Sequence, residues 1–450
     1  MESPFIRYNT PISQIFNEES KLQYWLKVEA ALAKAHAKLG NIPADAAEEI
    51  ERKAKIQFVK VERVKEIDKE IHHDLMAMVK ALEEQCEGNA GNYIHLGATS
   101  YDTEDTATAL QIKDALNYLE GSILKILKTL TNLAEQKKKL VCIGRTHGQH
   151  ATPTTYGMRF GVWAYEFSRH LDRLKQVRDR IQYGKMSGAV GTMASFGDKG
   201  FEIQQEVMQE LKLNPVLIAN QVIQRDRIAE TILLTALIAG TCSKIAREFR
   251  ILQRTEIGEM YEPFKKDTQV GSSTMPHKRN PYKSERICSL GRVIKSNAIV
   301  ALDNMVLEDE RDMTNSASER VIISENFIFL DFILSQLEQN LRNLEINEKN
   351  IKKNLHLTRG AILAERIMVE LVKRGIGRQD AHELLRKMII KARKDDKSIK
   401  EVFMEIHEVK SKFSNKELDK LLTPERYLGT AITQVENLIK YLREKYKITK

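Results

Sequence analysis

The stretch IAETILLTALIAGTCSKI, residues 228–245, decides the fold class of this chain. A helix drawn through it carries apolar side chains on nearly every face, and such a helix must be surrounded by other helices. Its most apolar part, residues 231–243, is shorter than the roughly 20 residues that cross a bilayer. Charged residues flank both ends, namely Asp226, Arg227, Glu230, Lys244 and Arg247. We therefore predict a buried helix inside a bundle and no membrane partner.

The rest of the chain favours the same fold class. Its 450 residues include only 22 Gly and 9 Pro, and long stretches rich in Leu, Ile, Ala, Glu and Lys favour helices over short strands. A chain of this length is expected to form two or three domains. We predict an all-α protein with an N-terminal helical domain over residues 1–100, a central long-helix bundle over 101–341 and a smaller C-terminal helical domain over 342–450. Other subunits could help to close the central bundle.

Charge and cysteine content restrict the setting in which the chain works. The formal net charge is +9, which fits an anionic ligand but also an ordinary charged surface. The four cysteines lie far apart without a CxxC pair, which argues against a disulfide framework or zinc ribbon and for a reducing compartment. Residues 1–10 lack a basic segment followed by an apolar core, so no secretory signal is expected. We predict a cytoplasmic protein.

The loop GSSTMPHKRNP, residues 271–281, carries the most informative polar cluster. It places hydroxyl side chains beside Lys278 and Arg279, which suits a reacting dianion, although an ordinary basic surface loop would have the same composition. Asn280 is expected to cap the following helix, with Pro281 at its first position.

Three further segments carry histidines. In GRTHGQHATP, residues 144–153, Thr152 and Pro153 predict a helix start, so His147 lies in the connection before it and can transfer a proton near neutral pH. His150 in the same segment is as consistent with a structural role as with a place in the site. In residues 93–102, a helix is expected to begin at Thr99 and Ser100, where backbone N–H groups can bind an anion. The third is IHHD, residues 71–74.

The loop of residues 271–281 resembles the signature loop of the fumarase/aspartase superfamily, and its length and composition make the match specific. The resemblance implies that Ser272 is the base that removes a Cβ proton, that Lys278 and Asn280 hold substrate carboxylates, and that Glu285 supports Lys278. The segment around Thr146 and His147 is similar to the Thr-His-Gly motif of the superfamily, which implies that His147 is the general acid and that Thr146 contacts substrate. A serine base needs a positive field to stabilise its alkoxide.

Within the superfamily the chain resembles adenylosuccinate lyases most, and the resemblance covers most of the chain in the same order. It implies elimination of fumarate from adenylosuccinate to give AMP, and from SAICAR to give AICAR, in purine biosynthesis. It also implies a homotetrameric helical core, active sites shared between subunits, and no cofactor or metal. The implied catalytic and substrate-binding residues outside the two motifs are Arg7, Tyr8, His73, Asp74, His95, Thr99, Ser100, Gln221, Arg311, Ser316 and Arg320, with His72 included because the doubled histidine leaves the register uncertain by one.

Other functions remain open on the residues alone. His72, His73 and Asp74 could be ligands of an HD-type metal phosphohydrolase, although that reading leaves the Ser272 loop unexplained. A helical structural or nucleic-acid-binding protein is a second alternative, but the basic residues are not gathered into one tract with aromatics, so we expect no nucleic acid partner. Inside the superfamily, the alternatives are an argininosuccinate lyase or a carboxymuconate cycloisomerase.

Overall fold

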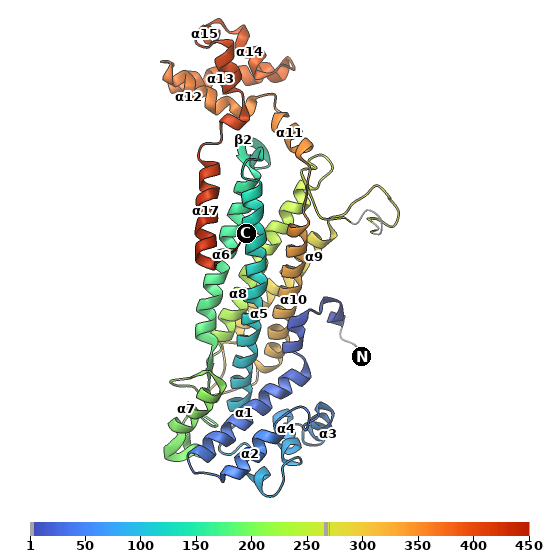
Figure 1. Cartoon of the computed structure of the whole chain (residues 1–450), viewed down its shortest axis with the longest axis vertical. Helices are drawn as coiled ribbons and strands as arrows, with labels where there is room; N and C mark the ends of the chain where they lie inside the picture. The colour runs from blue at the N-terminus through green and yellow to red at the C-terminus, as the bar shows by residue number, and fades with distance from the viewer. Residues whose placement is uncertain (1–3, 265–268, 270, 450) are drawn as a thin grey trace. The chain divides into compact units, whose positions relative to one another are not determined.

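The computed structural model describes residues 4–264, 269 and 271–449. The chain is 68% helical, and its strands form short two-stranded sheets in the described residues (Figure 1). The prediction of an all-α fold is therefore confirmed.

Five long helices form the framework. They are α5 (Ser100–Gln136), α6 (Tyr156–Ile181), α8 (Asp226–Leu252), α9 (Tyr282–Asp303) and α10 (Ser316–Arg342). Helix α8 contains the apolar stretch that predicted a bundle. By length and composition alone α8 could cross a membrane, but 61% of its most apolar window is buried inside the protein, and the core helices of soluble proteins pass the same test.

The chain divides into two compact units. Unit 1 comprises residues 1–124, 169–243 and 286–335, and unit 2 comprises residues 125–168, 244–285 and 336–450. This grouping does not test the predicted division into three domains, which stays a prediction.

Unit 1 carries its own apolar core among its shorter helices. Helix α1 packs against α2 and α7, and α3 packs against α4 (Figure 1). Residues such as Leu26, Leu32, Leu75 and Met78 are fully buried there. Besides parts of the long helices, its elements are η1 (Pro4–Tyr8), η2 (Pro11–Ile15), α1 (Glu18–Lys38), α2 (Ala44–Lys53), α3 (Val61–Ile71), α4 (Asp74–Glu83), η3 (Ala90–Tyr93), β3 (Tyr183–Gly184), η4 (Ala194–Lys199), α7 (Gly200–Leu211) and β4 (Asn214–Pro215).

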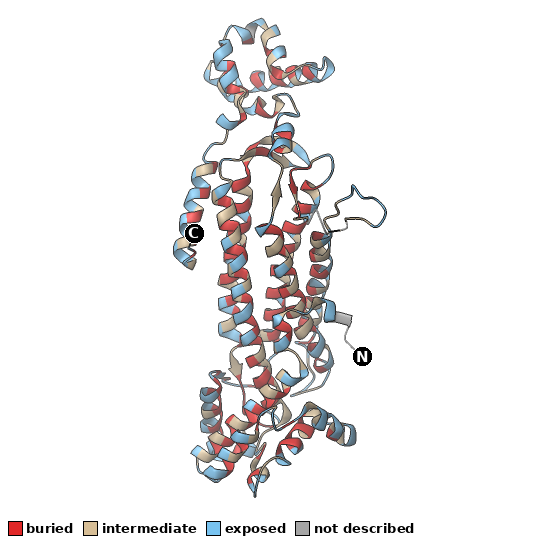
Figure 2. Cartoon of the chain, turned by 45° about the vertical axis from the view of Figure 1, so that its right-hand side comes forward, coloured by how far each residue is buried: buried red, intermediate tan, exposed pale blue. Residues whose placement is uncertain are grey.

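Unit 2 combines parts of the long helices with short helices that share a second core. Figure 2 shows buried residues on the inner sides of the short helices and exposed residues on their outer sides. Ile367, Leu371, Val402 and Phe403 are fully buried there. Its remaining elements are β1 (Val141–Thr146), β2 (Gln149–Thr155), β5 (Met260–Tyr261), β6 (Glu345–Ile346), α11 (Glu348–His356), η5 (Ala361–Leu363), α12 (Ala364–Lys373), α13 (Arg378–Lys394), α14 (Ile399–Glu405), α15 (His407–Lys410), α16 (Asn415–Leu421), η6 (Pro424–Arg426) and α17 (Ala431–Tyr446).

The predicted helix start at Thr152 and Pro153 is wrong. Both residues lie in β2, which pairs antiparallel with β1, and Pro153 faces Ile143 across the ladder. Helix α6 begins only at Tyr156. The local pattern of Thr152 and Pro153 resembles a helix start. The pairing of β2 with β1 depends on tertiary contacts, which that pattern does not show.

The predicted cap of the helix after the Ser272 loop is also wrong. Helix α9 begins at Tyr282, and the Asn280 side-chain amide donates instead to the carbonyl of Gly271, at 3.2 Å. The Glu262 carboxylate takes over the capping role, since it accepts the backbone N–H groups of Lys283 at 3.2 Å and Ser284 at 2.5 Å. A carboxylate at a helix start satisfies free N–H groups and complements the helix dipole.

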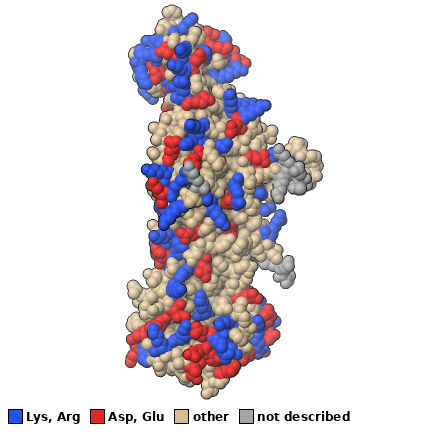
Figure 3. Space-filling model, in the orientation of Figure 1, with Lys and Arg blue, Asp and Glu red and all other residues tan. Residues whose placement is uncertain are grey.

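The charged residues do not form one basic tract on the face that Figure 3 shows. Lys and Arg side chains alternate there with Asp and Glu. Many of them form ion pairs across or along helices, such as Lys34 with Glu210 and Arg180 with Glu230. On this face, therefore, basic and acidic side chains are mixed.

Candidate active site

His147 lies at the tip of the β1–β2 hairpin in unit 2. The hairpin turn consists of His147 and Gly148, whose φ angles are +53° and +74°. Two residues with positive φ form the turn type that best matches the twist of a two-stranded ribbon. The His147 side chain is exposed, which leaves its imidazole accessible for proton transfer.

The base of this hairpin is fixed by a buried carboxylate. Glu259 is buried, and it accepts hydrogen bonds from Arg145 at 2.6 Å, Tyr156 at 3.0 Å and Asn354 at 2.8 Å. The Arg145 and Asn354 donors hold the pKa of Glu259 below its ordinary value, although burial opposes this. Glu259 therefore stays ionised and ties β1 to α6 and α11.

The Ser272 hydroxyl is surrounded by donors from its own loop. Its Oγ accepts the backbone N–H groups of Met275 at 3.1 Å and Thr274 at 3.3 Å. Lys278 lies in the same loop and is exposed. Two N–H dipoles aimed at an oxygen stabilise negative charge on it, which is the requirement for a serine that acts as a base.

Contacts at Arg279 anchor the end of this loop. The Arg279 guanidinium pairs with Glu345 at 3.0 Å and lies over the rings of Phe264 and Tyr261. Its backbone carbonyl accepts a hydrogen bond from Gln253 at 2.8 Å. Arg279 thus fixes the two neighbouring candidate residues, Lys278 and Asn280, relative to the β5–β6 sheet.

The predicted contact between Glu285 and Lys278 is not seen among the described residues. Both side chains are exposed, and the Glu285 backbone N–H donates to the Pro281 carbonyl at 3.0 Å. The supporting role of Glu285 stays a prediction. In unit 2, Thr146 is exposed beside the His147 turn.

Unit 1 brings together several residues that lie far apart in sequence. His73 is the N-cap of α4, and its Nε2 lies 3.5 Å from Ser100 Oγ at the start of α5. The adjacent Asp74 pairs with Arg320 of α10 at 2.9 Å. His72 is exposed and ends α3 in a left-handed conformation. The structure thus places His73, and not His72, against Ser100.

Glu104 adds an unusual carboxyl to this cluster. It lies 3.8 Å from Arg320, and burial together with the charge of Asp74 raises the pKa of Glu104 to about 7. Lys21 approaches Asp74 at 3.9 Å, and burial and Arg320 lower the pKa of Lys21. The cluster therefore combines cations with one carboxyl group, that of Glu104, which can exchange a proton near neutral pH.

Tyr101 joins a second group of candidate residues in unit 1. Its hydroxyl donates to Ser316 Oγ at 3.2 Å, and the Arg311 guanidinium lies 3.5 Å from its ring centroid. Arg311 also approaches the Gln221 side-chain oxygen at 3.5 Å. Gln221, Arg311 and Ser316 are therefore neighbours, as a shared ligand would require.

The N-terminal pair, Arg7 and Tyr8, contacts α10 through the ring of Tyr8. The Tyr8 ring packs edge-on against Phe329 and Phe332, with centroids 5.5 Å and 5.2 Å away. The preceding Arg7 is exposed. Packing of the tyrosine ring thus holds an accessible guanidinium at the surface of unit 1.

His95 makes a buried contact that the sequence did not reveal. Its Nδ1 lies 2.8 Å from Glu29 Oε1, and the same oxygen accepts the hydroxyl of Thr103 at 2.7 Å. The carboxylate of Glu29 and the charge of Asp102 raise the pKa of His95, although burial opposes this. Thr99 at the start of α5 donates its backbone N–H to Asp102 at 2.9 Å.

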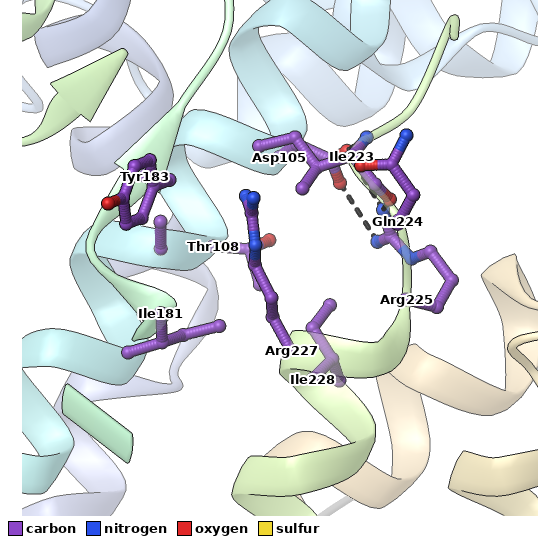
Figure 4. Close-up of a pocket in the computed structure, with 10 residues that line it drawn as sticks. Asp105, Thr108, Ile181, Tyr183, Ile223, Gln224, Arg225, Arg227 and Ile228 are labelled. Carbon is purple, nitrogen blue, oxygen red and sulfur yellow. Dashed lines mark hydrogen bonds and ion pairs between the residues drawn. The ribbon is translucent and has the colours of Figure 1, made fainter. Parts of the chain in front are cut away.

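Beneath these residues lie three buried ion pairs. Lys185 and Asp102 are both fully buried and 2.5 Å apart, and Arg225 bridges Asp105 and Glu319 at 2.8 Å and 2.9 Å. Figure 4 shows the pair of Asp105 and Arg225 beside a small cavity. With a volume of about 20 Å³, this cavity has room for about one water molecule and not for a nucleotide.

Some of these partners carried a weak signal in the sequence. Glu29 lies one turn after Trp25 and next to Val28 on the apolar face of its helix, and a charged residue there indicates a paired buried group. Asp102 and Asp105 were visible only as acidic residues of a first helical turn. Lys185 has no local signal at all, because its partner is 83 positions away.

Among the residues that the structure describes, no group of three or more His, Cys, Asp and Glu side chains is placed to hold a metal ion. The HD-type phosphohydrolase requires such a group.

Comparison with known proteins shows the family of the chain. Residues 6–295 match the family described as "Lyase", and residues 360–438 match the family "Adenylosuccinate lyase C-terminus". The chain is 52% identical to an adenylosuccinate lyase of Methanocaldococcus jannaschii, over 98% of this chain and 95% of that protein, and 52% identical to one of Pyrococcus abyssi, over 96% and 95%. A 3-carboxy-cis,cis-muconate lactonizing enzyme from Pseudomonas putida has a similar structure, with a TM-score of 0.91 and 30% identity over 98% of this chain and 99% of that chain. The chain belongs to the adenylosuccinate lyase family of the fumarase/aspartase superfamily of carbon–nitrogen lyases.

Proposed function

We propose that this chain eliminates fumarate from adenylosuccinate to give AMP, and from SAICAR to give AICAR, in purine biosynthesis. The observation that carries the proposal is the Ser272 loop, in which two backbone N–H groups donate to Ser272 Oγ near Lys278 and Asn280. The names of relatives that are half identical over nearly the full chain support the choice of substrate.

The reaction requires two proton transfers on opposite faces of the substrate. Ser272 removes the proton from Cβ of the succinyl group, and the electron pair left behind forms the C=C bond of fumarate as the C–N bond breaks. His147 donates a proton to the departing nitrogen, so AMP leaves neutral at that atom. Both steps fall within ordinary general acid–base catalysis.

The charge that develops between these steps must be held in place. Lys278 and Asn280 bind the carboxylate over which the carbanion spreads, and Thr146 contacts the same substrate beside His147. Preorganised cations and donors of this kind are often the largest contribution to rate. No cofactor is needed for the proposed reaction.

Unit 1 supplies the proposed nucleotide side. Arg7, Arg311 and Arg320 offer guanidinium groups for the phosphate. The His73–Ser100 contact, at 3.5 Å, supports His73 as the histidine that orients the reacting end. The other proposed contacts are Tyr8, His72, Asp74, His95, Thr99, Gln221 and Ser316.

We further propose a homotetramer with active sites shared between subunits. Apolar residues are exposed on the long helices, among them Leu237 of α8, Ile299 of α9 and Val321 of α10, each more than half exposed. Large exposed apolar residues on neighbouring helices are typical of an interface with another copy. Free cysteines support a cytoplasmic location.

A lactonizing enzyme of the carboxymuconate type is the second candidate. The similarity to the Pseudomonas putida enzyme, with a TM-score of 0.91, favours it over more distant functions. An argininosuccinate lyase uses the same superfamily fold. Substrate turnover separates all three because their products differ.

The first experiment is an ultraviolet assay of chelator-treated protein with adenylosuccinate, which follows AMP and fumarate. We expect turnover by the natural chain and almost none by Ser272→Ala. Ser273→Ala is the matched control, because it removes the neighbouring hydroxyl and leaves the Ser272 contacts in place. Absence of turnover by a folded protein would reject this substrate, and carboxymuconate and argininosuccinate would then be assayed.

A further inference from the structure

Glu29 is a buried carboxylate with an incomplete set of hydrogen bonds. Its side chain is fully buried on α1, and Oε1 accepts hydrogen bonds from Thr103 and from the ring of His95. Its other oxygen, Oε2, is buried and has no hydrogen-bond partner in the structure. A buried carboxylate is costly unless a positive charge compensates it. A cation close to Glu29 therefore stabilises it.

His95 is the group in position to supply that cation. Its Nδ1 is 2.8 Å from Glu29 Oε1, and only 10% of its side chain is exposed. With Nδ1–H donating to Glu29, the remaining nitrogen, Nε2, carries a proton only in the imidazolium form. In that form Nε2–H can donate to an anion.

The other charged groups around His95 do not supply the positive charge that would compensate Glu29. Asp102 of α5 adds a second negative charge that favours imidazolium, but the fully buried Lys185 neutralises it at 2.5 Å. His36 of α1 lies near the same loop, where its Nε2 is 3.0 Å from the Leu96 carbonyl and its Nδ1 is 3.1 Å from the Asn41 amide. This pattern suits a neutral His36, and burial lowers the pKa of His36.

The backbone conformation around His95 is also restricted. His95 has a φ of +61°, which is uncommon for a residue other than glycine. Two residues later, Gly97 has a φ of +73°, and a Cβ there would lie 2.8 Å from the Phe196 ring. The loop therefore has little freedom, and the Glu29 contact fixes which way the imidazole faces.

We infer that Glu29 is a positioning residue that orients His95 and keeps it charged, so that His95 Nε2–H binds an anionic group of the substrate. This inference rests on the proposed function for the identity of the anion, which is a phosphate or a carboxylate. It does not rest on that function for the charge of His95.

The test compares Glu29→Gln with Thr103→Val. Glu29→Gln keeps the size and an acceptor but removes the charge, whereas Thr103→Val removes the other hydrogen bond to the same oxygen and leaves the charge. Selectively labelled histidine is followed by NMR between about pH 5 and pH 9, and His95→Gln identifies the signal. We expect the pKa of His95 to lie above 6.5 in the natural chain and in Thr103→Val. In Glu29→Gln we expect the basicity of His95 to fall at least about tenfold.

Kinetics and binding give the second readout. We expect kcat/KM for adenylosuccinate to fall about tenfold in Glu29→Gln near pH 8, where the weakened imidazolium is lost, and to approach the natural value near pH 6. Binding of AMP and of fumarate, measured separately by calorimetry, identifies the anion, because only the ligand whose group contacts His95 loses affinity in Glu29→Gln.

Two results would overturn the inference. One is a His95 that titrates at or below 6.5 in the natural chain, which is measurable even if Glu29→Gln does not fold. The other is a folded Glu29→Gln that binds both AMP and fumarate as the natural chain does. Failure of the natural chain to turn over adenylosuccinate would reject the proposed function and leave the NMR test of the Glu29–His95 pair intact.

Discussion

Ser272 and His147 are the two residues whose surroundings bear most directly on the proposed proton transfers. Ser272 Oγ accepts two backbone N–H groups of its own loop, so negative charge on it is partly compensated before substrate arrives. His147 is exposed at a turn tip and can approach a leaving nitrogen without rearrangement of a core.

Replacement of His147 tests its role as the acid. We expect His147→Ala to lower kcat for adenylosuccinate by about 10²–10⁴-fold, the usual contribution of a general acid. The matched control is His382→Ala, which removes another exposed histidine of unit 2, on α13, and should leave kcat unchanged. Unchanged turnover in His147→Ala would remove this residue from the mechanism.

At this scale the sequence reveals residues whose chemistry is local. The Ser272 loop and the Thr146–His147 pair are contiguous motifs, so their candidate roles could be predicted. The roles of Glu29 and Lys185 could not be predicted, because their partners lie 66 and 83 positions away in the sequence, respectively.

The β1–β2 hairpin is the element that positions His147, the proposed acid. Gly148 follows His147 with a φ of +74° and has no neighbour within 4 Å of a Cβ placed there. Gly121 in helix α5 is equally unhindered but has ordinary helical geometry. The same substitution at these two glycines therefore isolates the effect of backbone conformation.

We expect opposite effects on stability. Gly148→Ala should lower the free energy of unfolding by about 1–2 kcal/mol, the cost of a left-handed conformation, and should reduce kcat because it shifts His147. Gly121→Ala should raise the free energy of unfolding by about 0.5–1 kcal/mol. Denaturant titration measures both, and equal effects at the two positions would contradict the observed turn.

Helix α5 also carries a pH-dependent element. The pKa of Glu104 is raised to about 7, first by burial and then by Asp74. Between its ordinary value of 4.5 and about 7, the folded state thus binds a proton that the unfolded state lacks. The stability contributed by this group is full at low pH and falls as the pH rises through that window.

Glu104→Gln removes this dependence. Compared with the natural chain, the variant should be more stable near pH 8, by at most about 3 kcal/mol, and equally stable near pH 4. Denaturant titrations at the two pH values measure the difference, and an effect that does not change with pH would contradict it.

The elements themselves were predictable where the hydrophobic period was long and clear. The all-α class and the buried α8 followed from one apolar stretch. The hairpin was missed because Thr152 and Pro153 resemble a helix start, and the cap of α9 was missed because Glu262 precedes that helix by 20 positions and reaches it only through the fold.

The whole molecule distributes the candidate residues over two units. Unit 2 contains the proposed base, acid and carboxylate clamp, whereas unit 1 contains the proposed phosphate side. Between the described residues of unit 2, no hydrogen bond or ion pair joins the His147 turn to the Ser272 loop. We propose that complete sites form from several copies.

Mixing two inactive variants tests shared sites. Ser272→Ala and His147→Ala should each be inactive alone, and subunit exchange between them should restore activity, because some sites then receive both an intact base and an intact acid. Refolding each variant alone is the control. No recovery after mass spectrometry has shown mixed oligomers would contradict sites built from different subunits.

The two-residue turn at His147 also limits how this enzyme can change over evolutionary time. Arg145 faces His150 and Thr146 faces Gln149 across the ladder, so one inserted residue would invert the side of the ribbon on which every later side chain emerges. A change of length in this hairpin would displace the proposed acid, His147, even where every side chain is kept. Among descendants of this gene, insertions and deletions should therefore spare residues 145–150 and accumulate elsewhere.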